Sequence, residues 1–345
     1  MVNRFPVTPR TTINDVASLA GVSKATVSKY LSATDYYVSQ QTRAKIESAI
    51  KELNYYPNAL AQGLSSRRSY AIGVVVASIT NPFYPELVAG VEEVIDPAGY
   101  TLLLGASAEN SDKEADVVRT MIQRRVDGAI VASATMRDGS VQQLVNAGIN
   151  VVVASRELAR PLVDTVVIDN RMGGRMAAEH LKRHGHVRAA FLTGPLDVLA
   201  FRQRFEGFRS VYRETESTVH LARTSELAEA THAAADLLRD LRGPTAVFAA
   251  NDTLALGLMT AAHEAGLSVP EDIALIGFDD IWVGRVPGVS LTTVNSKARQ
   301  VGAVAAGMLA ERIGRHPGEN RDARTSPQRR VLAPELVVRG SCGCP

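Results

Sequence analysis

Residues 11–31, TTINDVASLAGVSKATVSKYL, alternate apolar and polar positions with the period of two short helices joined at a glycine. The apolar positions of the first helix recur at helical spacing: Ile13, Val16, Ala17 and Ala20. Thr12 stands where an N-cap belongs, with Asp15 three residues on, in the position of a capping box. Gly21 can take a positive φ and end the helix. The pattern predicts a short helix with one buried face.

The second helix of the pair has a different outer face. Ser23 can cap it, and Val27 and Leu31 would face inward. The outward positions are small, polar or cationic: Lys24, Ala25, Ser28 and Lys29. Such a face suits a recognition helix that enters the major groove of DNA. The alternative is an ordinary helical hairpin with a solvated face.

A third helix and a weaker helical segment follow. Ser39 can cap a helix over residues 40–54. Its apolar stripe comprises Ile46, Ile50 and Leu53. Residues 58–66, NALAQGLSS, favour a helix but are too few to be helical alone in water. We therefore expect this segment to fold only when a partner supplies a surface.

From Tyr70 onward, short apolar runs alternate with helical patterns. A first series of runs comprises residues 71–77, 100–106, 128–134 and 150–156, and a second comprises 164–170, 188–194, 245–251 and 273–279. Continuous apolar strands separated by helices predict parallel sheets covered on both faces. Two series predict two doubly wound lobes, with ligands bound at the carboxyl ends of the strands in the cleft between lobes.

Many segments in a fixed order resemble the lactose/galactose-repressor (LacI/GalR) family of bacterial transcription factors. They run from about Thr11 to Gly340 and include TINDVASLAGVSKATVSKYL, VSQQTRAKIESAIKELNYYPNALAQGL, ITNPFYPELVAGVEE, RQRFEGF, AVFAANDTLALG and VPEDIALIGFDD. The resemblance implies an all-α helix-turn-helix DNA-binding head and an α/β effector domain. That domain would have two doubly wound lobes, similar to periplasmic sugar-binding proteins, with three chain crossings between them.

We expect the following domain boundaries. The parts are a tail (1–10), the helix-turn-helix domain (11–56), a hinge helix and linker (57–69), and an effector-binding and dimerisation domain (70–345). The first lobe would comprise about 70–167 and 295–325, and the second about 168–294 and 326–341. The crossings would lie near 167–169, 293–296 and 325–328.

The resemblance also implies a homodimer that reads a near-palindromic DNA operator. The candidate DNA-binding residues are Thr12, Ser23, Lys24, Ala25, Thr26, Ser28 and Lys29 in the head, and Asn58, Ala61 and Leu64 in the hinge. In the family, a leucine at the position of Leu64 wedges into the central base step and bends the DNA. Charge is consistent with this: residues 1–70 carry nine Lys and Arg against four Asp and Glu, a net +5, and the remainder carries −3.

Polar residues at strand ends are the candidates for a small-molecule effector site. They are Asn81, Phe83, Tyr84, Ser155, Arg204, Asn251 and Asp279. The resemblance implies that Arg204 anchors the effector and that Asp279 accepts hydrogen bonds from two of its hydroxyl groups. Phe83 offers an aromatic platform, although a core aromatic under the loop is the alternative. Asp252 and Asp280 are expected to be helix caps or structural residues.

The class of effector has to be inferred from the types of residue at the candidate site. Some family members have an aspartate where this chain has Ser155, and an aromatic for which the segment RTSELAEAT has no obvious match. Arg204, Asn251 and Asp279 together favour a polyhydroxy ligand, with a purine or another anion as the alternative. We expect a repressor that its ligand releases from DNA; the alternative is a purine-responsive regulator that needs its ligand as co-repressor. The chain ends without a leucine heptad, which favours a dimer over a tetramer.

Other classes of protein fit less well. No run of about 20 apolar residues exists, and the start, MVNRFPVTPRTT, lacks the apolar region of a secretory signal, so we expect a cytoplasmic protein. A secreted sugar-binding protein and a sugar-processing enzyme are therefore disfavoured, the latter because no dinucleotide, P-loop or nucleophile-elbow motif is present. His180 and His184 lie at a helix end that the family exposes, and Cys342 and Cys344 are expected to be incidental thiols. We predict neither a cofactor nor a metal ion.

Overall fold

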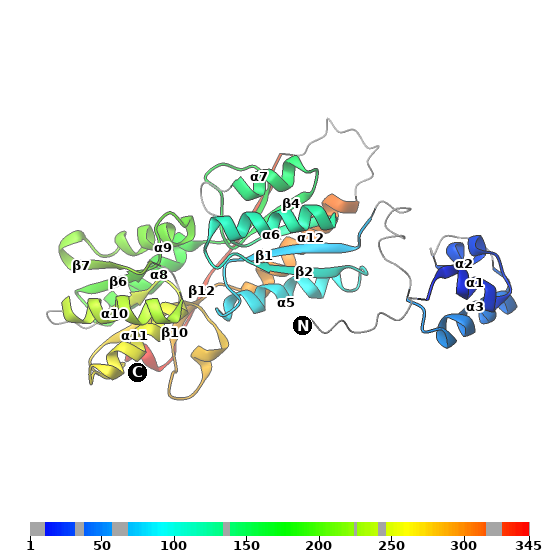
Figure 1. Ribbon diagram of the computed structural model, residues 1–345. Coiled ribbons are helices and arrows are strands. Elements are labelled where there is room, and N and C mark those ends of the chain that lie inside the picture. Colours follow the sequence, from blue (N-terminus) through cyan, green and yellow to red (C-terminus); the bar gives the residue numbers. More distant parts are fainter. Residues whose placement is uncertain are drawn as a thin grey trace, which may run out of the picture. The chain divides into compact units, whose positions relative to one another are not determined.

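The computed structural model describes residues 11–31, 38–56, 68–133, 139–223, 226–240, 246–314 and 326–344 (Figure 1). The chain divides into two compact units, Met1–Ser69 and Tyr70–Pro345. The break coincides with the expected start of the effector domain.

Among its described residues, the first unit forms the helices α1 (Ile13–Ala20), α2 (Lys24–Leu31) and α3 (Gln40–Glu52). Their small core is formed by Val16, Ala17, Ala20, Val27, Ile46, Ala49 and Tyr55, with Ile13, Val22, Leu31, Ile50 and Leu53 packed against it. Thr12 and Asp15 form the reciprocal capping box, and Gly21 ends α1 in the left-handed region at φ 65°. The predicted apolar faces are therefore the ones that pack.

The first lobe of the second unit is an all-parallel sheet of six strands in the order β11-β5-β4-β3-β1-β2. The strands are β1 (Ala71–Val76), β2 (Thr101–Ala106), β3 (Gly128–Val131), β4 (Asn150–Ala154), β5 (Asp164–Ile168) and β11 (Arg329–Leu332). Helices α5 (Phe83–Ile95) and α12 (Ala298–Gly314) cover one face, and α6 (Ser111–Arg124) and α7 (Gly139–Asn146) cover the other (Figure 1). Each face has its own apolar core.

The second lobe repeats this plan with the strand order β12-β10-β9-β8-β6-β7. Its strands are β6 (Ala189–Thr193), β7 (Ser217–Leu221), β8 (Ala246–Ala249), β9 (Ala274–Asp279), β10 (Thr292–Asn295) and β12 (Glu335–Val337), the last antiparallel to β10. Helices α8 (Asn170–Arg183) and α9 (Leu199–Arg209) pack together on one face, and α10 (Leu227–Asp240) and α11 (Asp252–Glu264) pack together on the other (Figure 1). Short 3-10 turns lie at Glu214–Glu216, Trp282–Arg285 and Gly340–Cys342.

One grouping of strands and one assignment of chain to lobe differ from the prediction. The sequence pattern groups the run at 164–170 with the second series, but β5 pairs with β4 in the first sheet, which agrees with the expected first-lobe boundary near residue 167. It also places residues 326–341 in the second lobe, but β11 pairs with β5. The third crossing therefore lies between β11 and β12, after residue 332, and not at 325–328. The reason is that β11 completes the edge of the first sheet before the chain leaves it.

Two smaller expectations also change. The predicted strand at 100–106, β2, is only partly buried, because it lies at a sheet edge, as do the partly buried β7, β11 and β12. His180, which the sequence predicts at an exposed helix end, is 6% exposed, because the C-terminal segment covers it, whereas His184 is exposed. No helix in the described part of the chain is both long enough and apolar enough to cross a membrane.

Candidate effector pocket and DNA-reading helix

The outer face of α2 presents the residues that the sequence predicts. Ser23 accepts a hydrogen bond from the backbone N–H of Thr26 at 3.1 Å and so begins the helix. Lys24, Ala25, Ser28 and Lys29 are exposed, while Val27 on the opposite face is fully buried. Because its apolar face is buried, α2 exposes a surface of small and cationic side chains.

Contacts between α2 and α3 fix the orientation of that surface. The Tyr30 hydroxyl donates a hydrogen bond to Glu47 at 2.8 Å, and the Arg43 guanidinium lies 5.8 Å from the centre of the Tyr30 ring. At the start of α1, hydrogen bonds from the backbone N–H and the hydroxyl of Thr12 lower the pKa of Asp15. The hinge candidates Asn58, Ala61 and Leu64 lie outside the described residues, so their predicted roles stay predictions.

A cavity lies where the carboxyl ends of strands from both lobes meet. From the first lobe it is lined by Asn81, Phe83, Tyr84, Ser155 and Arg156, and from the second by Val198, Ala200, Phe201, Arg204, Asn251 and Asp279. All seven predicted effector residues are among them. The cavity volume is about 30 Å³, which is room for about two water molecules and far below the roughly 300 Å³ of a small ligand site. A ligand must therefore move the walls apart to enter.

Arg204 forms the polar floor of this cavity. Its Nε donates to Asn170 Oδ1 at 2.8 Å and one terminal nitrogen donates to the Ala250 carbonyl at 2.6 Å. The guanidinium lies 3.6 Å from the centre of the Phe278 ring. These contacts leave the other terminal nitrogen directed at Asp279, at 3.8 Å from its Oδ1. The arginine is thus held in place before a ligand arrives, which lowers the cost of ordering it on binding.

Close packing of α8 on α9 places Arg204 there. A Cβ at Gly174 would lie 2.2 Å from the backbone oxygen of Arg204, so any larger residue would push the two helices apart. Arg204 and Asn170 are both nearly fully buried. Gly174 therefore allows the close approach of α8 and α9 that positions the Arg204 guanidinium in the cavity wall.

Asp279 ends β9 and faces Arg204. Its φ is 123°, and the φ of Asp280 is 59°, both in the region that favours glycine. Two successive non-glycine residues with positive φ store backbone strain of about 1–3 kcal/mol each. Burial raises the pKa of Asp279 to about 7, and the Arg204 charge opposes that rise. A carboxyl group that titrates near neutrality in a cavity is a candidate for a functional role.

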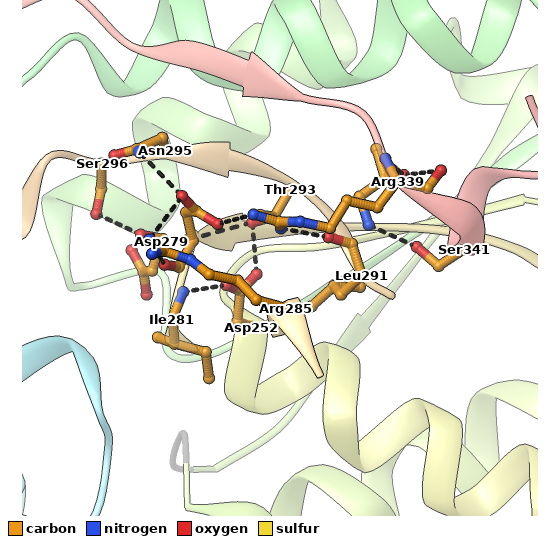
Figure 2. Close-up of polar contacts among 12 residues, drawn as sticks. Asp252, Asp279, Ile281, Arg285, Leu291, Thr293, Asn295, Ser296, Arg339 and Ser341 are labelled. Atoms are coloured by element: carbon orange, nitrogen blue, oxygen red, sulfur yellow. Dashed lines mark hydrogen bonds and ion pairs between the residues drawn. The ribbon is translucent and has the colours of Figure 1, made fainter. Parts of the chain in front are cut away.

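A polar network holds the segment after β9 in this strained conformation (Figure 2). Asp252 accepts hydrogen bonds from the Thr293 hydroxyl at 2.6 Å and the Ile281 backbone N–H at 2.9 Å. Asp280 accepts from Arg339, Arg285 and Asn295. Both carboxylates are therefore engaged by the protein, in agreement with their expected structural role.

The two asparagines of the cavity use their acceptor atoms within the protein. Asn251 Oδ1 caps α11 by accepting the Leu254 N–H at 2.8 Å, and Asn81 Oδ1 accepts the Phe83 N–H at 3.0 Å. Each side chain can then offer a ligand its amide N–H groups and the remaining lone pair of its oxygen. Phe83 is 5% exposed, and its ring meets the Tyr84 ring edge-on with the ring centres 5.1 Å apart. Phe83 therefore packs in the core and also lines the cavity wall.

Arg156 is a cavity residue that the sequence reasoning missed. It donates to the Ser133 carbonyl at 3.1 Å and forms an ion pair with Glu109 at 3.0 Å, and it is 6% exposed. Burial raises the pKa of the neighbouring Tyr84, so its hydroxyl remains a donor. The available signal was position: Arg156 follows Ser155 at the carboxyl end of β4. Val198, Ala200 and Phe201, also missed, surround the start of α9.

Comparisons with known proteins match both units. The family model "Bacterial regulatory proteins, lacI family" matches residues 12–58, and the "Periplasmic binding protein-like domain" matches residues 178–342. The HTH-type transcriptional repressor PurR of Vibrio vulnificus is 34% identical over 95% of this chain and 97% of its own length. The ribose operon repressor of Escherichia coli is 35% identical over 96% and 99%.

Solved structures show the same architecture. The lac repressor dimer bound to operator and the anti-inducer ONPF has a TM-score of 0.81 and 26% identity, covering 97% of this chain and 99% of that one. The complex of the transcriptional regulator CelR with cellobiose has a TM-score of 0.69 and 32% identity, covering 96% and 100%.

Proposed function

The chain belongs to the lacI family of bacterial regulatory proteins, and on this premise we propose that it is a transcriptional repressor controlled by a small molecule. The head binds an operator in double-stranded DNA, with α2 in the major groove. The protein acts as a homodimer on a near-palindromic site, in the cytoplasm, where the bacterial chromosome lies. Its lobes bind the effector and are not proposed to catalyse a reaction.

One observation supports regulation by a ligand most strongly: the cavity takes its walls from both lobes. Asn81, Phe83 and Tyr84 come from the first lobe, and Arg204 and Asp279 from the second. A ligand held by both walls makes different contacts when the lobes are open and when they are closed. Only such differential affinity can shift a conformational equilibrium. The cavity volume of about 30 Å³ is small for a ligand site, so we expect binding to change the spacing of the lobes.

We propose a polyhydroxy effector, a sugar or sugar derivative. A buried carboxylate at Asp279 can accept hydrogen bonds from two hydroxyl groups on neighbouring carbons of a sugar ring. Arg204 and the amide groups of Asn81 and Asn251 can donate to its oxygens, and Phe83 offers an apolar face. The similar regulator CelR forms a complex with cellobiose, a ligand of this class, and another relative is named the ribose operon repressor.

A purine effector is the second candidate, favoured by the aromatic side chains in the cavity wall. Phe83, Tyr84 and Phe201 all line it, and aromatic rings stack on nucleobases. A relative bearing the name of a purine repressor matches at similar identity. The two candidates differ in the expected response, since a sugar would release the operator whereas a purine would act as co-repressor.

In the proposed mechanism, the hinge carries the change from the lobes to the DNA. Residues 58–66 would fold as paired hinge helices against the minor groove, and Leu64 would wedge between base pairs. Effector binding changes the angle between the lobes and with it the spacing of the hinge helices. Leu64→Ala should therefore weaken operator binding at least about tenfold while effector binding is unchanged.

The DNA-binding part is tested by selecting sites from random duplex DNA with the full-length protein and measuring affinity by fluorescence anisotropy. We expect a near-palindromic selected site, and an affinity that falls steeply with salt because the basic head displaces counterions from phosphates. Failure to enrich any sequence would contradict the proposal.

The effector part is tested by a thermal-shift screen of the same protein against sugars, sugar phosphates and purines. A ligand at 100 times its dissociation constant should stabilise the folded protein by about 2.7 kcal/mol. Each hit is then added to the operator complex. A sugar that lowers operator affinity supports the first candidate, and a purine that raises it supports the second.

A further inference from the structure

The end of the chain brings two thiols against a buried imidazole in the second lobe. His180 lies in the last turn of α8, and Cys342 and Cys344 lie in the C-terminal segment. His180 Nε2 is 3.0 Å from Cys344 Sγ, and the donor atoms of all three residues lie within 4.8 Å of one another. Residues 164 positions apart in sequence therefore present one nitrogen and two sulfur atoms to a common point.

The backbone around the cysteines is fixed by the lobe itself. The Ser341 hydroxyl donates to the Leu275 carbonyl at 2.7 Å and accepts the Thr292 N–H at 2.8 Å, which anchors the 3-10 turn on the sheet. Gly343 then takes φ 68°, turning the chain so that Cys344 returns toward α8. Neither thiol is part of a disulfide. The anchored Ser341 and the turn at Gly343 thus place the two cysteines.

The donor set and its spacing match zinc chemistry. Zn²⁺ binds Cys sulfur at about 2.3 Å and His nitrogen at about 2.0–2.1 Å in tetrahedral geometry, which puts donor atoms roughly 3.5–3.8 Å apart. The observed separations, from 3.0 Å to at most 4.8 Å, reach that range through small side-chain movements. The sequence alone shows a C-x-C pair without further ligands; the fold supplies the third.

We propose that His180, Cys342 and Cys344 bind one Zn²⁺ ion, with the fourth position open to solvent. Cys342 is 2% exposed, whereas Cys344 is only partly buried, so an ion can reach the site past Cys344. The bound ion joins residues 340–344 to α8.

Zinc binding at this site also depends on pH. Zn²⁺ binds cysteine as the thiolate and histidine as the neutral imidazole, so binding releases protons and the affinity for Zn²⁺ should rise with pH.

The test uses full-length protein, reduced and stripped of metal, titrated with Co²⁺ under anaerobic conditions. We expect an absorption band from thiolate-to-cobalt charge transfer that saturates at one Co²⁺ per chain and disappears when Zn²⁺ is added. Cys344→Ser is the main variant because this side chain is partly exposed. It should lower Zn²⁺ affinity at least about 100-fold, since even outer-shell partners of a metal site contribute about 10–100-fold.

Two further variants separate this site from adventitious binding. His180→Gln should behave as Cys344→Ser does, and His232→Gln, which removes an exposed imidazole on α10 of the same lobe, should bind as the parent does. Zn²⁺ should raise the melting temperature of the parent and of His232→Gln only. Absence of the band, or equal binding by the parent and Cys344→Ser, would overturn the proposal. Isolation of the protein with Cys342 and Cys344 joined in a disulfide and no bound Zn²⁺ would overturn it too.

Discussion

Replacing Asp279 by asparagine should separate effector sensing from DNA binding. The substitution keeps the size of the side chain and removes its charge at the end of β9. Arg204 retains its hydrogen bonds to Asn170 and the Ala250 carbonyl, so the cavity floor should stay in place. Operator affinity should remain within about twofold of the parent because the altered group lies in the effector domain.

The expected loss in effector affinity can be worked from the contacts. A carboxylate that accepts two hydroxyl protons becomes an amide with a single acceptor oxygen. One hydrogen bond to a charged group contributes about 1.5–3 kcal/mol, so the dissociation constant should rise about 10- to 150-fold. Calorimetry with a ligand from the thermal-shift screen measures this directly. Asp116→Asn, which neutralises an exposed carboxylate in the first lobe, is the matched control.

The pH dependence gives a second, independent readout. Burial raises the pKa of Asp279 to about 7, so the carboxylate gains a proton as pH falls through that value. A protonated carboxyl group has no negative charge and cannot accept both hydrogen bonds from the ligand hydroxyl groups as an anion does. The effector affinity of the parent should therefore fall from pH 8 to pH 6. The Asp279→Asn protein should show no such slope. Unchanged effector affinity in the variant, or an equal loss of operator affinity, would refute the assignment of Asp279.

Three further predictions concern the head, the body and its internal network. Lys24→Ala and Lys29→Ala should each cost on the order of 1–3 kcal/mol at a cognate site and relax base preference, as measured by anisotropy; equal losses on random DNA would assign these lysines to phosphates alone. The fragment 70–345 should fold, dimerise and bind effector without DNA affinity, and sedimentation as a monomer at micromolar concentration would contradict a dimer interface within it. Asp280→Ala should destabilise that fragment by roughly 3 kcal/mol in urea unfolding, because it strands the half-buried guanidinium of Arg339; an unchanged midpoint would show that the network is dispensable.

Sequence reasoning reached the cavity because its polar residues follow apolar strands. In a parallel sheet the carboxyl ends of neighbouring strands lie at one edge, so residues such as Asn81, Asn251 and Asp279 can be named from the order of strands and polar residues alone. It missed Arg156, whose approach to the cavity depends on Glu109 and the Ser133 carbonyl, far along the chain. It also did not show that the amide oxygens of Asn81 and Asn251 accept backbone N–H groups, because that depends on the local geometry of the chain.

The sequence by itself determined the features that depend on short-range periodicity and capping. The three helices of the head, the outward face of α2 and most strands of the two sheets follow from neighbours within a few turns or residues. Only the tertiary structure decided the partners of strands at the sheet edges and the contacts between distant segments. The pairing of β11 with β5 and the approach of Cys344 to His180 both join residues about 164 positions apart. No local pattern encodes such pairs, because their stability comes from burying surfaces that exist only once the lobe that contains them has formed.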